Sequence, residues 1–194
     1  MNRLLQTLVV VSSVSLLSAC VTPHSYVDPQ YRKASYEQIH RPTQAMPVKV
    51  QIQFQRNGKP LPAVDSELRG HVERALRASG VFVPTADAAS SISVTANNIA
   101  DLAAARAKGF GTGLTFGAAG SHVDDNYEFS CSFTDPSRPP QTLVYQHAIH
   151  STIGNADGPP GLSATTPADA FGRVVEDVML NFVWELQTKG VLQQ

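Results

Sequence analysis

The feature that most constrains the fold is a strict alternation of apolar and polar residues that begins at residue 48. Val48, Val50, Ile52 and Phe54 alternate with Lys49, Gln51, Gln53 and Gln55. Because successive side chains of a β-strand point to opposite faces, this run predicts a strand with one buried and one solvated face. Asn57-Gly58 follows directly and favours a tight turn.

Two segments carry apolar residues at helical spacing. The first stripe contains Val64, Leu68, Val72, Ala75, Leu76 and Ser79, with Gly80 as its C-terminal stop. The second and broader stripe contains Phe171, Val174, Val175, Val178, Met179, Phe182, Val183 and Leu186. Thr166 is predicted to cap this second helix, with Pro167 in its first turn and Lys189-Gly190 at its end.

Three further strands are predicted from alternation, around residues 92–96, 127–133 and 143–149. The Pro-rich connection of residues 135–140 joins the last two as a hairpin. The expected order is therefore β-α-β-(Gly-rich insert)-β-β-α. We predict an α+β fold, a mostly antiparallel sheet with two helices packed on one face and the other face wet.

The N-terminus has the layout of an export signal. Arg3 supplies a positive start, an apolar stretch runs from Leu4 to Leu17, and Leu17-Ser18-Ala19-Cys20 follows. This tetrapeptide resembles the lipobox of bacterial prolipoproteins, in which the cysteine thiol receives a diacylglyceryl group and the chain is cut in front of it. The resemblance implies lipidation of Cys20, and Val21 after it favours the outer membrane. The alternative is an ordinary cut near Ala19 that leaves Cys20 as a free thiol.

We expect a signal peptide at 1–19, a lipidated N-terminus and flexible tether at 20–46, and a single α+β domain at 47–194. Residues 20–46 are rich in proline and lack an apolar period. The 15 Lys and Arg residues fall to 14 once Arg3 is removed, against 16 Asp and Glu, so the mature chain has a formal charge of −2. That balance argues against nucleic acid as a partner.

A glycine-rich insert at 108–120 is the most unusual stretch. At a period of two, Phe110, Leu114 and Phe116 share one apolar face, while the other face is nearly bare. Gly113-Leu114-Thr115-Phe116-Gly117 resembles a segment of uncharacterised proteobacterial outer-membrane lipoproteins. A phosphate loop fits poorly because no Gly-Lys-Ser/Thr occurs. A membrane-inserting or oligomer-forming hairpin and a strand or loop packed at the domain edge stay open.

Residues able to support chemistry are few. On a strand, His147 and His150 point to opposite faces, so His147 is expected to be a hydrogen-bonded core residue and no shared metal is expected. Cys131 alternates with Phe129 and Phe133 and is expected to be buried. Asp124, Asp125 and Glu128 form a small acidic cluster that we interpret as solvated.

We therefore expect a non-catalytic accessory or interaction module in envelope assembly or transport, anchored on the periplasmic face of the outer membrane through Cys20. No cofactor is predicted. The partner is expected to be an envelope protein, oligomerisation is open, and Phe110, Leu114, Phe116 and His150 are the candidate interaction residues. The alternative is a tethered enzyme or small-ligand binder that uses the open sheet face with His150, Asp124 and Asp125.

Overall fold

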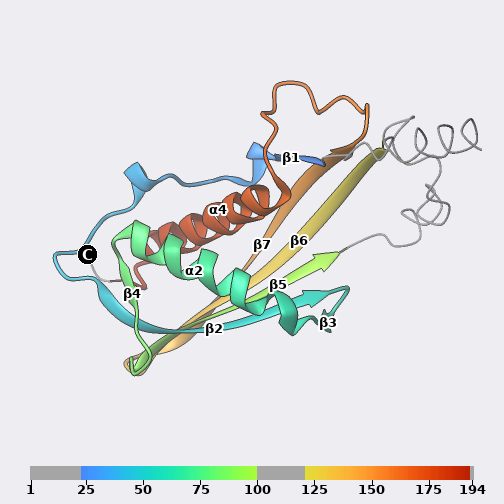
Figure 1. Ribbon diagram of the computed structural model, residues 1–194. Coiled ribbons are helices and arrows are strands. Elements are labelled where there is room, and N and C mark those ends of the chain that lie inside the picture. The colour runs from blue at the N-terminus through green and yellow to red at the C-terminus, as the bar shows by residue number, and fades with distance from the viewer. Residues whose placement is uncertain (1–22, 100–120, 193–194) are drawn as a thin grey trace, which may run out of the picture.

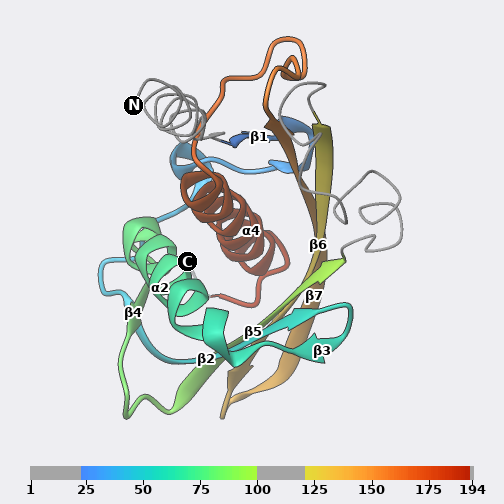
Figure 2. The ribbon, with the colours of Figure 1, turned by 45° about the vertical axis from the view of Figure 1, so that its right-hand side comes forward.

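The computed structural model describes residues 23–99 and 121–192. They form one curved sheet with two α-helices on its concave side (Figures 1 and 2). The helices are α2 (Asp65–Ser79) and α4 (Pro167–Thr188). The strands are β1 (His24–Val27), β2 (Met46–Arg56), β3 (Lys59–Pro60), β4 (Phe82–Pro84), β5 (Ser90–Ile99), β6 (Ser121–Asp135) and β7 (Arg138–Ile153).

The seven strands of this sheet run in the order β1-β7-β6-β5-β2-β3, with β4 also paired to β2. The α+β class, the mostly antiparallel sheet and the placement of both helices on one face are confirmed. The predicted order is incomplete, because β1, β3 and β4 were not anticipated. Moreover, β2 pairs with both β4 and β5 in parallel, which makes the sheet mixed.

The β2-α2-β5 unit follows from local sequence. Helix α2 buries Leu68, Val72, Ala75, Leu76 and Ser79, the predicted stripe without Val64, which lies just before the helix. Gly80 ends the helix with a φ of 73°, a left-handed conformation that glycine adopts without strain. The crossover through α2 returns the chain in the same direction, and β5 therefore joins β2 in parallel.

Helix α4 fills the concave side of the sheet. The side-chain oxygen of Thr166 accepts a hydrogen bond from the backbone N–H of Asp169, as the predicted N-cap requires. The helix buries most of its length against β7, β1 and α2. Cys131 on β6 lies in the same core with no exposed surface, which confirms its expected burial.

The segment from residue 23 to 46 differs from the predicted flexible tether, because it is packed on the domain. β1 pairs with β7, and Tyr26, Ala34 and Ile39 are buried. The side chain of Asn181 on α4 accepts hydrogen bonds from the backbone N–H groups of Lys33 (2.9 Å) and Ala34 (3.0 Å) and donates to the carbonyl of Tyr31 (2.9 Å). These contacts join residues far apart in the sequence. The segment therefore shows no local apolar periodicity that would have predicted its docking.

The outer edge of β2 is capped by side chains of α2. Asp65 accepts a hydrogen bond from the backbone N–H of Phe54 at 2.7 Å, and Arg69 donates to the carbonyl of Val50 at 2.9 Å. Such capping satisfies backbone groups that would otherwise invite another strand.

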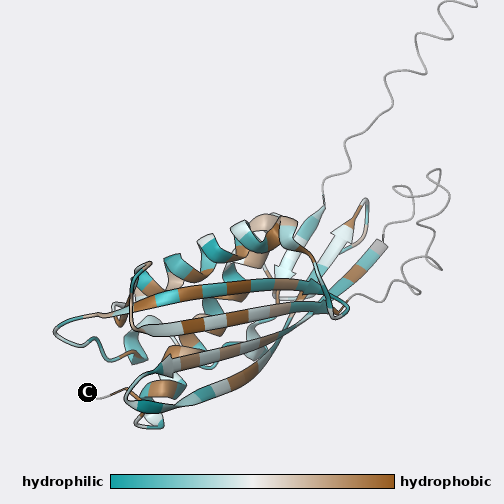
Figure 3. Ribbon diagram, turned by 90° about the horizontal axis from the view of Figure 1, so that it is seen from below, coloured by the Kyte–Doolittle hydropathy of each residue, from teal (hydrophilic) through white to brown (hydrophobic). Residues whose placement is uncertain are grey.

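The convex face of the sheet carries no helix and is polar. Its side chains are mainly hydroxyls and amides, and they alternate with the buried residues along each strand, which Figure 3 displays as bands of hydropathy. Val144 and Ile99, with 59% and 43% of their surfaces exposed, are large apolar exceptions among the described residues of this face. The open face predicted from the sequence is thus present in the described part of the sheet.

Candidate functional site

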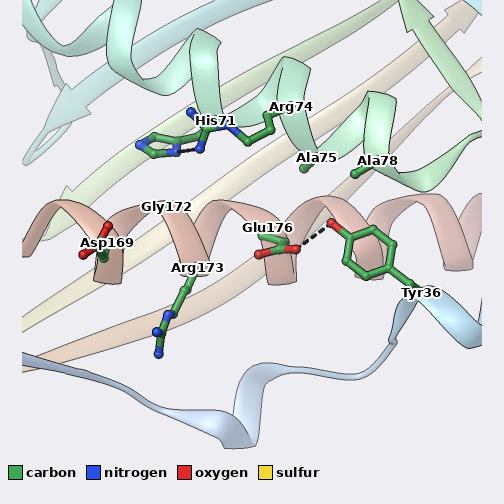
Figure 4. A pocket seen from close by; sticks show the side chains of 9 residues that line it. All are labelled: Tyr36, His71, Arg74, Ala75, Ala78, Asp169, Gly172, Arg173 and Glu176. Carbon is green, nitrogen blue, oxygen red and sulfur yellow. Dashed lines mark hydrogen bonds between the residues drawn. The ribbon is translucent and has the colours of Figure 1, made fainter. Parts of the chain in front are cut away.

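A groove of about 410 Å³ lies between α2, α4 and the N-terminal segment, on the side of the helices away from the sheet. Figure 4 shows the side chains that line it. They are Tyr36, His71, Arg74, Ala75, Ala78, Asp169, Gly172, Arg173 and Glu176. Two cations, two carboxylates, an imidazole and a phenol therefore meet in one hollow.

His71 lines the groove at a close contact between the two helices. A Cβ at Gly172 would lie only 2.8 Å from Cε1 of His71, so the glycine allows the ring to lie against α4. The ring also contacts the edge of Phe171, at 5.8 Å between centroids. Gly172 is unfavourable within a helix by about 1 kcal/mol relative to alanine, and this close approach is its structural reason.

His71 is held in its neutral form. Arg74 donates a hydrogen bond to Nδ1 at 3.1 Å, so Nδ1 accepts and the ring proton lies on Nε2. Nε2 faces the Glu67 carboxylate at 3.9 Å. Burial, followed by the Arg74 charge, lowers the pKa of His71. The groove therefore presents a neutral imidazole between exposed charged groups.

The N-terminal segment closes one side of the groove through Tyr36. Its hydroxyl donates to Oε1 of Glu176 at 2.5 Å (Figure 4). Burial, together with this bond to a carboxylate, raises the pKa of Tyr36. The phenol thus stays protonated and fixes Glu176, beside which Arg173 is exposed to solvent.

A second hollow of about 430 Å³ continues past the first and shares Arg173 and Glu176 with it. Asp177 lines this hollow. Its two carboxylate oxygens lie 3.4 Å from Nε of Arg32 and 3.4 Å from Nε2 of His147, which lies beneath the surface. His147 has 1% of its surface exposed, which confirms the predicted core histidine. The two hollows form a polar strip along α4, which we call the α4 groove.

The exposed cations of the α4 groove can bind a ligand. In the described part of the chain Arg173 has no hydrogen bond or ion pair to another side chain, and Arg74 contacts only His71. Asp169 and Glu176 match these two cations in number. Such a lining suits an extended polar segment with charges of both signs better than a simple anion.

The residues predicted from the sequence lie elsewhere. His150 and Asp124 do meet on the open sheet face, with 2.7 Å between Nδ1 and Oδ1, and Asp28 approaches Nε2 at 3.6 Å. The hydrogen bond to Asp124 raises the pKa of His150, and Asp28 adds to this effect. Asp125 is not part of this cluster: it points to the other face and accepts a hydrogen bond from Asn98 at 3.1 Å.

Cys20, Phe110, Leu114 and Phe116 lie outside the described residues, and their predicted roles stay predictions. Within residues 23–99 and 121–192, no group of three or more His, Cys, Asp or Glu side chains is arranged to hold a metal ion. No helix in the same ranges has the length and apolar character needed to cross a membrane.

Sequence reasoning missed the α4 groove, although part of its signal is present. Asp169, Arg173 and Glu176 are spaced by four and three residues and so share one helix face. A charged face is by itself typical of a solvated helix. The groove exists only because α2 and residues 34–38 pack beside that face, which is long-range information.

The fold defines a two-layer α+β domain with a polar groove on its helical side. No protein-family model matches the chain, and no curated protein matches it. The similar solved structures include a Xanthomonas campestris protein described as DUF330, 14% identical, with a TM-score of 0.38 over 78% of this chain and 96% of that chain.

Two other similar structures are the PelC dodecamer of Paraburkholderia phytofirmans and a minor lipoprotein of Acinetobacter baumannii. The first is 13% identical with a TM-score of 0.35, over 86% of this chain and 98% of that chain. The second is 11% identical with a TM-score of 0.32, over 77% of this chain and 92% of that chain. Similarity at this level assigns the chain to no family.

Proposed function

We propose that the protein is a lipid-anchored component of the bacterial cell envelope, on the periplasmic face of the outer membrane, whose domain binds a partner protein. The observation that carries this proposal is the lipobox-like Leu17-Ser18-Ala19-Cys20 only a few residues before β1 begins at His24. A lipid on Cys20 would hold the binding domain at the membrane surface.

The α4 groove is the proposed partner site. Arg173 has no side-chain partner among the described residues, and Arg74 bonds only to His71, so both could pair with carboxylates of a partner. Asp169 accepts a hydrogen bond from Thr166 and could also receive a cation, so an extended polar segment of a partner could be held in one orientation. The fixed pair of Tyr36 and Glu176 supplies a rigid wall, which lowers the entropy lost on binding.

The anchor is tested by metabolic labelling with radioactive palmitate followed by separation of the two membranes. The wild-type chain should be labelled and recovered in the outer-membrane fraction, whereas Cys20→Ala should be unlabelled. An unlabelled wild-type chain that is released with the periplasmic contents would overturn the anchor.

The partner site is tested with a photo-crosslinking amino acid at Arg173, in cells that express the protein at its native level. Val144 on the open sheet face is the comparison position, because it is exposed but lies on the opposite side of the sheet. We expect a discrete crosslinked protein from position 173 and none from 144. The reverse result would move the function to the open face, where the alternative of a ligand binder with His150 and Asp124 applies.

A matched pair of charge reversals strengthens this test. Arg173→Glu changes the groove, and Lys49→Glu makes the same change of charge on the open sheet face. Recovery of the crosslinked or co-purified partner should fall with Arg173→Glu and persist with Lys49→Glu. Equal loss in both variants would indicate a general electrostatic effect and contradict a site in the α4 groove.

A further inference from the structure

One end of the sheet gathers chain segments that are far apart in the sequence. His24 at the start of β1 pairs with Thr152 near the end of β7, and Thr152 also pairs with His122 near the start of β6. Since neighbouring strands are about 4.8 Å apart, the Cα atoms of His24 and His122 are separated by roughly 10 Å. We call His24, His122 and Thr152 the anchor end of the sheet.

The distance between Cys20 and the anchor end is limited by covalent geometry. His24 lies four positions after Cys20, and an extended chain spans at most about 3.6 Å per position, so the two Cα atoms are within about 14 Å. The headgroup layer of one leaflet is itself roughly 5–8 Å thick. A lipid on Cys20 therefore leaves no room for a stalk, because β1 is already fixed in the sheet at His24.

The charges near the anchor end are compatible with a lipid surface. The carboxylates of Asp124 and Asp28 both face His150, at 2.7 and 3.6 Å. When protonated, the imidazole cancels one of these two negative charges, so repulsion from anionic headgroups is reduced. His24 and His122 are exposed at the same end and add no negative charge.

We propose that the anchor end of the sheet faces the lipid headgroups directly, so that the long strands β6 and β7 lead away from the membrane. The occupant of this surface is a phospholipid bilayer rather than a second protein. The inference rests on the proposed lipid at Cys20. It adds a fixed orientation, which a flexible tether would not impose.

The two ends of β6 offer a matched pair of reporter sites. His122 and Thr134 are both exposed, lie on the same face of the same strand, and are 12 residues or about 40 Å apart. His122→Cys and Thr134→Cys can each be labelled with a fluorophore, because Cys131 is buried and Cys20 would carry lipid. The full-length lipidated protein is placed in vesicles of phosphatidylethanolamine and phosphatidylglycerol with a nitroxide on a fraction of the headgroups.

We expect most of the fluorescence at position 122 to be quenched and none at position 134. A control with about 15 Gly and Ser residues inserted after Val21 adds an average reach of about 22 Å and should abolish the quenching at 122. Equal quenching at both sites in protein that floats with the vesicles would refute the orientation alone. Wild-type protein that does not float with the vesicles would refute the lipid anchor and the orientation together.

Discussion

The docking of residues 31–34 on α4 relies on one buried amide, and Asn181→Leu should loosen this part of the N-terminal segment. Asn181 has 2% of its surface exposed and makes three hydrogen bonds, to the N–H groups of Lys33 and Ala34 and to the carbonyl of Tyr31. Leucine has the same branched shape, so no cavity is created. It leaves three backbone groups without a partner in a poorly hydrated position.

At about 1 kcal/mol for each lost hydrogen bond, the substitution should lower the free energy of unfolding by about 3 kcal/mol. For a domain of this size that corresponds to a fall in Tm of about 6–12 °C. Urea and thermal unfolding measure the change. Amide hydrogen exchange shows where the structure is loosened. In the variant, the amides of Lys33 and Ala34 should lose their protection while the amides of the sheet keep theirs.

Gln187 offers a matched control, because it makes the same kind of contact at the surface. Its side chain accepts from the backbone N–H of His40 at 3.1 Å and donates to the carbonyl of the same residue. Gln187→Leu should cost only about 0.5 kcal/mol, since water can replace both bonds. The reasoning is refuted if Asn181→Leu is as stable as the wild type and the wild-type amides of Lys33 and Ala34 exchange freely.

Burial raises the pKa of the Cys131 thiol, so a thiol reagent should label this residue only after unfolding; rapid labelling of the native domain would contradict its buried position. Asp65→Ala removes the acceptor for the N–H of Phe54 and should cost about 1.5–3 kcal/mol in urea unfolding, whereas Asp65→Asn, which keeps an oxygen, should cost less. Equal costs would mean that the hydrogen bond contributes nothing. The hydrogen bond to Asp124 raises the pKa of His150, so the stabilisation from this pair is complete below about pH 6.5 and is lost as the pH rises through the folded-state pKa. Because the pair is partly exposed, the loss should stay below about 1 kcal/mol, and it should be missing in His150→Gln when unfolding is followed across this range.

The sequence predicted those elements whose own residues carry a strong period. The alternation from Val48 to Gln55 and the stripes of α2 and α4 correspond to observed elements within a few residues, because one face of each must be buried. β1 has four residues and no such period. Its pairing with β7 and the anchoring of residues 31–34 by Asn181 depend on groups about 125–150 residues away, which no local pattern encodes.

The side chains discussed as candidate sites were also only partly predictable from the sequence. The pair of His150 and Asp124 arises from register within a single hairpin, and both residues could be chosen as candidates from the sequence. The α4 groove requires Gly172 to accept the ring of His71 from another helix and Tyr36 to reach Glu176 from the N-terminal segment. Neither contact has a sequence signature, because each joins elements whose relative placement is set by the whole core.

If Cys20 carries a lipid, the short link between Cys20 and β1 also restricts the kind of partner that the α4 groove could bind. With a lipid at Cys20, the path to Arg173 runs five positions along the chain to Ser25, across one bridge to Thr165, two positions to Pro167 and six positions along α4. Its length is at most about 40 Å. A partner bound there must itself lie at the membrane or reach down to it, and proteins confined to the middle of the periplasm are therefore excluded as partners of the proposed site.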